Sequence, residues 1–80
     1  MQITIVGFGI AKDILGNNTI EMELPEAASV KQMKASLLEE YPDFQKLRSL
    51  AIAVNNEYAP DDLILNGRDD VVLIPPVSGG

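Results

Sequence analysis

One segment of this 80-residue chain has the pattern of an amphipathic helix, and it lies between segments that have strand patterns. Four apolar residues share one helical face of residues 29–41, namely Val30, Met33, Leu37 and Tyr41. Ser29 is a good N-cap, Gln32 three residues later completes a capping box, and Pro42 ends the helix. Because a single helix can cover only one face of a sheet, this segment favours a two-layer α+β sandwich.

Two strands are predicted before this helix. Residues 2–8 are rich in β-branched side chains, and residues 19–24 alternate between apolar and polar ones. The Asn17-Asn18 pair between them is a turn signal, so we expect an antiparallel hairpin. A short helical turn is expected over residues 10–16, ending at Gly16.

Three strands are predicted after the helix. Residues 50–54 alternate, residues 57–59 can form a short strand after a turn, and residues 71–74 form a continuous apolar run typical of a buried central strand. Asp61-Asp62 predicts a helical turn over residues 63–65. This order of elements matches the β-grasp, or ubiquitin-like, arrangement, in which one main helix covers a mixed sheet and the first and last strands pair in parallel.

The composition excludes several kinds of function. Twelve acidic residues against six basic ones give a net charge of −6, whereas nucleic-acid binders present basic surfaces. The chain has no cysteine and no histidine, so it lacks disulfides, thiolate metal ligands and the usual general base. We therefore expect no metal site, no nucleic-acid partner and no self-contained enzyme.

The location of the protein is predicted from its apolar segments. The first ten residues lack the basic start and the length of a signal peptide. No stretch approaches the roughly 18 apolar residues that a membrane span needs. We expect a cytoplasmic protein with no membrane partner.

The last residues, IPPVSGG, are the most informative part of the sequence. Pro75 and Pro76 cannot continue a sheet ladder, and they hold the backbone extended. We therefore divide the chain into a β-grasp domain, residues 1–75, and a flexible tail, residues 76–80. The Gly79-Gly80 pair gives the tail a thin end that can thread a narrow channel.

The reactive group at such an end is the main-chain carboxylate. It is a poor electrophile until it is activated, for example as a mixed anhydride with AMP. The activated carbonyl then accepts sulfide, a thiol or an amine. The alternative interpretation is a frayed terminus, where small residues also collect.

Several segments give the chain a family resemblance over nearly its whole length. They are the opening strand ending in Phe8, the capped helix, AIAVNNEYA at residues 51–59, LNGRDDV at residues 65–71, and IPPVSGG at residues 74–80. The chain resembles the sulfur carriers of molybdopterin and thiamine synthesis and the ubiquitin-related modifiers. The Pro-Pro-Val-Ser-Gly-Gly ending favours the branch that contains the small subunits of molybdopterin synthase.

The resemblance implies a mechanism. An ATP-dependent activating enzyme would adenylate the carboxylate of Gly80, and sulfur would then replace AMP to give a thiocarboxylate. The tail residues Val77, Ser78 and Gly79 would insert into the large subunit of molybdopterin synthase, a heterotetramer. There the sulfur would pass to cyclic pyranopterin monophosphate in molybdenum cofactor biosynthesis. The chain would hold no permanent cofactor and would not be catalytic alone.

We also predict a docking patch for the partner, formed by Phe8, Tyr58 and Ile74. All three residues lie at strand ends or on a hairpin, near the point where the final strand ends. Exposed apolar patches of this kind mark interaction sites. The alternative is that each of the three side chains belongs to the hydrophobic core.

Three other functions stay open at this point. The chain could be a sulfur carrier of the thiamine or tungsten pathway, or a ubiquitin-like modifier conjugated to lysines. It could also be a plain binding module with an idle tail.

Overall fold

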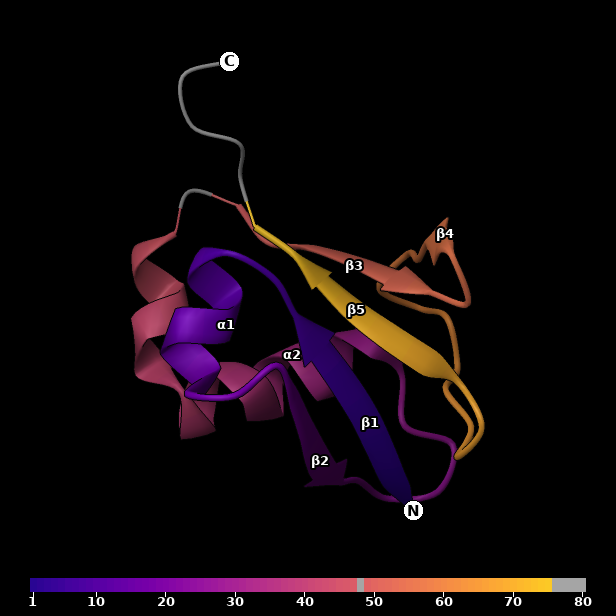
Figure 1. Ribbon diagram of the computed structural model, residues 1–80. Coiled ribbons are helices and arrows are strands. Elements are labelled where there is room, and N and C mark those ends of the chain that lie inside the picture. The colour runs from indigo at the N-terminus through magenta and orange to yellow at the C-terminus, as the bar shows by residue number, and fades with distance from the viewer. Residues whose placement is uncertain (48, 76–80) are drawn as a thin grey trace.

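Five strands form one mixed sheet, and the main helix α2 lies across one face of it (Figure 1). The structure is a computed structural model that describes residues 1–47 and 49–75. The elements in chain order are β1 (Gln2–Gly7), α1 (Ile10–Leu15), β2 (Thr19–Glu23), α2 (Val30–Glu40), the 3-10 helix η1 (Pro42–Lys46), β3 (Ala51–Val54), β4 (Glu57–Tyr58) and β5 (Asp70–Ile74). The predicted tail, residues 76–80, lies outside the described residues.

The strands follow the order β2-β1-β5-β3-β4 across the sheet. β1 pairs antiparallel with β2 and parallel with β5, and β3 pairs antiparallel with both β5 and β4. The predicted hairpin and the predicted parallel pairing of the first and last strands are therefore confirmed. This is the topology of the β-grasp fold.

The core lies between the sheet and α2. Alternate residues of β1 and β5 point into it, and Ile3, Ile5, Val71 and Leu73 are fully buried. Met33 and Leu37 cover them from the predicted face of α2. No helix among the described residues is long and apolar enough to cross a membrane.

The start of α2 agrees with the prediction, but the loop beside it does not. Ser29 and Gln32 form the capping box, since each side chain accepts a hydrogen bond from the other residue's backbone N–H. The helical turn predicted after Asp61-Asp62 is wrong, because Ile64 instead forms an antiparallel bridge with Ser29. The physical reason is that the first amides of a helix need acceptors. The backbone N–H groups of Val30 and Lys31 donate to the carbonyls of Leu63 and Asp61, both at 2.9 Å.

The short helix α1 packs against the end of β1, and it ends at Gly16 as predicted. Gly7 is buried at this contact. A Cβ atom on Gly7 would lie 2.9 Å from Leu15 Cδ1 and 3.2 Å from the backbone N of Lys12. The close approach of α1 to the sheet therefore depends on the missing side chain.

We predict that Gly7→Ala lowers the free energy of unfolding by about 1–3 kcal/mol, because the added methyl overpacks this contact. Gly67→Ala is the matched control, since its Cβ would lie 3.9 Å from the nearest atom, the carbonyl oxygen of Gln2. Denaturant unfolding should show a change within about 0.5 kcal/mol for that control. Equal stabilities of the two variants would contradict the prediction.

Candidate functional site

The face of the sheet opposite α2 carries apolar side chains near the end of β5. The alternation that buries Val71 and Leu73 places Val72 and Ile74 on this open face, where both are half-buried. Val72 is in register with Val6 on one side and Ala53 on the other. The final strand is therefore central, as predicted, but only one of its faces belongs to the core.

These side chains surround a shallow hollow of about 370 Å³. Its lining residues come from β3, β4, β5, the turn after β1 and the β3–β4 turn, and they are Phe8, Ala53, Asn56, Tyr58, Val72 and Ile74. We call this set the docking surface. The structure thus brings together the three residues of the predicted patch, Phe8, Tyr58 and Ile74.

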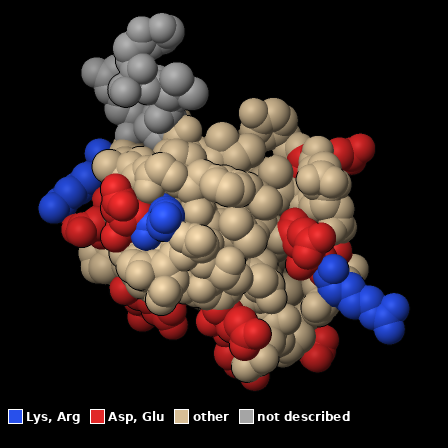
Figure 2. Space-filling model, in the orientation of Figure 1, with Lys and Arg blue, Asp and Glu red and all other residues tan. Residues whose placement is uncertain are grey.

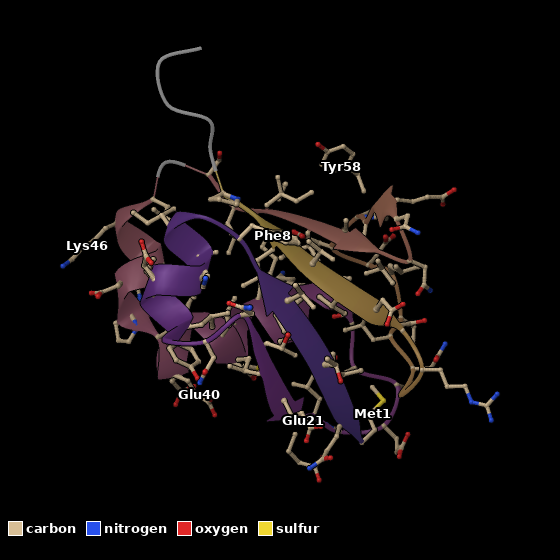
Figure 3. All side chains as sticks on the ribbon, in the orientation of Figure 1. Met1, Phe8, Glu21, Glu40, Lys46 and Tyr58 are labelled. Carbon is tan, nitrogen blue, oxygen red and sulfur yellow. The ribbon has the colours of Figure 1, made fainter. Side chains whose placement is uncertain are left out.

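Phe8 and Tyr58 lie on the surface and not in the core, with 60% and 76% of their area exposed. Figure 3 shows Phe8 where β1 ends and Tyr58 on the projecting hairpin of β4. Their use in docking stays a prediction. Val72, Ala53 and Asn56 were not predicted, although the spacing of Val72 and Ile74 on one strand signals that they share a face.

A tight turn holds Phe8 at the rim of the hollow. The backbone N–H of Ala11 donates to the carbonyl of Phe8 at 3.0 Å. Gly9 has φ 55° and ψ −128°, the first central position of a type II′ turn, which glycine adopts without steric cost. The chain therefore reverses directly after Phe8 and enters α1.

A second turn holds Tyr58 on the opposite rim. Tyr58 pairs with Ala53 in the β3–β4 hairpin. The two turn residues, Asn55 and Asn56, have φ values of 52° and 72°. Positive φ at both central positions is the signature of a two-residue hairpin turn, and asparagine is a favoured residue there.

The charges lie around the open face rather than at its centre. Figure 2 shows an uncharged central surface with acidic side chains toward its margins. Among residues 1–47 and 49–75 no charged or polar side chain is buried, and no group of three potential metal ligands occurs. The open face is therefore suited to contact with an apolar partner surface.

The docking surface lies at the base of the predicted tail. Ile74 lines the hollow, and Pro75 is the next residue and the last one described. The predicted site residues Val77, Ser78, Gly79 and Gly80 lie outside the described residues. In the sequence, two residues, Pro75 and Pro76, separate them from Ile74 of the docking surface.

Comparisons with known proteins find similar chains over the whole length of this one. The family model described as the ThiS family matches residues 5–80. A molybdopterin synthase sulfur carrier subunit from Caenorhabditis elegans is 32% identical, over 100% of this chain and 99% of the relative. The structure of SAMP1 from Haloferax volcanii, 20% identical, has a TM-score of 0.85 over 100% of both chains, a likeness of fold alone.

One solved structure contains a chain similar to this one in complex with another protein. It is the complex of subunits 1 and 2 of the molybdopterin-converting factor from Helicobacter pylori. The matching chain is 26% identical, with a TM-score of 0.70 over 100% of both chains.

Proposed function

The chain belongs to the ThiS family, and on that premise we propose that it is the sulfur-carrier small subunit of molybdopterin synthase. The observation that carries the proposal is similarity to sulfur carrier subunits of this enzyme along the whole chain, including the Gly79-Gly80 end. In this role the chain supplies one sulfur atom and no catalytic side chain. The proposed location is the cytoplasm, because activation of the carboxylate consumes ATP.

The proposed chemistry takes place on Gly80 in two steps. A carboxylate oxygen of Gly80 attacks the α-phosphate of ATP, so that pyrophosphate leaves and an acyl-adenylate forms. A sulfide sulfur then attacks the acyl carbon, and AMP leaves as the C–S bond forms. The product is a thiocarboxylate, and an ATP-dependent activating enzyme catalyses the first step. Both modifications are transient, so the chain needs no permanent cofactor.

The proposed partner is the large subunit of molybdopterin synthase, in a heterotetramer. The docking surface supports this, because an uncharged apolar hollow on a chain of net charge −6 is suited to a protein partner. Burial of Phe8 and Tyr58 against the large subunit would fix the base of the tail. Val77, Ser78 and Gly79 would then lead Gly80 into the partner's active site, where cyclic pyranopterin monophosphate accepts the sulfur in molybdenum cofactor biosynthesis.

We predict that incubation with ATP, a sulfur source and the cell's own activating enzymes changes the intact mass of the chain. The gain equals the replacement of one oxygen by sulfur, and the chain lacking Gly80 shows no gain. The added enzymes must first be shown to be active on a known carrier. With that control in place, an unchanged mass would overturn the carrier role, and linkage to lysines instead would identify a modifier.

We further predict that Phe8→Ala and Tyr58→Ala each raise the Kd for the large subunit about tenfold or more, since aromatic residues dominate interface energetics. Isothermal titration calorimetry measures the change. Ile64→Ala is the matched control. Ile64 is also a large exposed apolar residue, at 56%, but it bridges to Ser29 at the start of α2 and does not line the hollow. The free energy of unfolding should stay within about 0.5 kcal/mol for all three variants. An affinity that Tyr58→Ala leaves unchanged would remove Tyr58 from the docking surface.

A further inference from the structure

Two loops that are distant in the sequence are joined by side-chain hydrogen bonds beside the docking surface. Asn55 Nδ2 donates to Asp69 Oδ1 at 2.9 Å. Asn55 Oδ1 accepts from the backbone N–H of Asp70 at 3.0 Å, and the backbone N–H of Asn55 donates to the carbonyl of Asp70 at 2.9 Å. We call the paired side chains of Asn55 and Asp69 the clasp. It ties the β3–β4 turn to the loop that leads into β5.

The loop side of the clasp is itself fixed. The second carboxylate oxygen of Asp69 accepts from the backbone N–H of Asn66 at 2.9 Å. The backbone N–H of Asp69 donates to the carbonyl of Asn66 at 3.1 Å, and Asn66 Oδ1 accepts from the backbone N–H of Arg68 at 3.0 Å. Asp69 therefore reaches Asn55 from a turn that has little freedom of its own.

The hairpin side of the clasp is held by a short ladder. β4 is two residues long and lies at the edge of the sheet, where its ladder pairs are Ala53 with Tyr58 and Val54 with Glu57. One further backbone hydrogen bond follows β4, from the N–H of Ala59 to the carbonyl of Ile52 at 2.9 Å. Both turn residues, Asn55 and Asn56, hold positive φ angles. A two-residue strand is shorter than most strands of globular proteins, so contacts at the turn add to its placement. The Asn55 side chain adds two hydrogen bonds at the turn itself, one to the side chain of Asp69 and one to the backbone of Asp70.

We infer that the clasp is a positioning device for the docking surface, which sets the angle of the hairpin that carries Asn56 and Tyr58. Neither Asn55 nor Asp69 lines the hollow, so each acts through the hairpin and not by touching the partner. The inference rests on the proposed function, since the positioned residues are those that meet the large subunit.

The central variant is Asn55→Gly, because glycine keeps the positive φ angle and removes only the side chain. The Kd for the large subunit should rise about threefold to tenfold, the size expected for losing solvent-exposed hydrogen bonds. Asn55→Asp should weaken binding similarly, because its carboxylate faces that of Asp69.

A reciprocal exchange provides the rescue. In the double variant N55D/D69N the amide donates to the carboxylate in the opposite direction. The new amide oxygen still accepts from the N–H of Asn66, and the net charge of the chain is unchanged. The Kd of this double variant should return to within about twofold of wild type. A loss of affinity as large as that of Asn55→Asp would overturn the clasp.

A double-mutant cycle distinguishes an effect on the position of Tyr58 from a general loss of stability. In a Tyr58→Ala background, Asn55→Gly should change the Kd for the large subunit by less than about twofold, because the aromatic side chain that the clasp positions is already gone. Fully additive losses would contradict the inference.

An NMR measurement keeps the test independent of the partner. Nuclear Overhauser contacts between Tyr58 and Ala53 should weaken in Asn55→Gly and recover in N55D/D69N. Unchanged contacts between Tyr58 and Ala53 in Asn55→Gly would overturn the proposed role of the clasp. If wild type fails to bind the large subunit, the proposed function fails, and these contacts alone decide the clasp.

Discussion

The parallel pairing of β1 with β5 at the centre of the sheet sets the place of the other parts of the molecule. In this register Ile5 lies beside Val71 and faces α2, whereas Val6 lies beside Val72 and faces the opposite side. Because side chains alternate along a strand, a slip by one residue would exchange these two faces. The same pairing therefore builds the core and the docking surface, and it ends β5 beside the hollow.

The rims of the docking surface depend on backbone geometry more than on packing. Gly9 reverses the chain after Phe8 with a positive φ angle, and Asn55 does the same before Tyr58. These turns project aromatic side chains from a sheet edge and a strand end, where few neighbours hold them. We propose that the domain presents these apolar contacts to the partner, and that the reactive chemistry lies on the main chain beyond it.

Much of the fold could be predicted from local patterns, because the hairpin, the capped helix and the central strand each follow from neighbouring residues. The prediction of a helical turn after Asp62 was wrong, because the backbone amides at the start of α2 take the carbonyls of that loop as acceptors. The patch of Phe8, Tyr58 and Ile74 was predicted, but Val72 was missed because its apolar run was interpreted as a buried central strand. The contact of Asn55 with Asp69 spans 14 positions, and no local pattern signals it. The roles of residues 77–80 stay predictions.

The most direct test of the central claim follows the sulfur as it leaves the chain. The chain carrying a thiocarboxylate on Gly80 is mixed with the large subunit and cyclic pyranopterin monophosphate, and its intact mass is measured over time. We predict that the mass returns to that of the carboxylate only when both the large subunit and the pterin are present. Retention of the sulfur, with a large subunit shown to be active on a known carrier, would contradict the account.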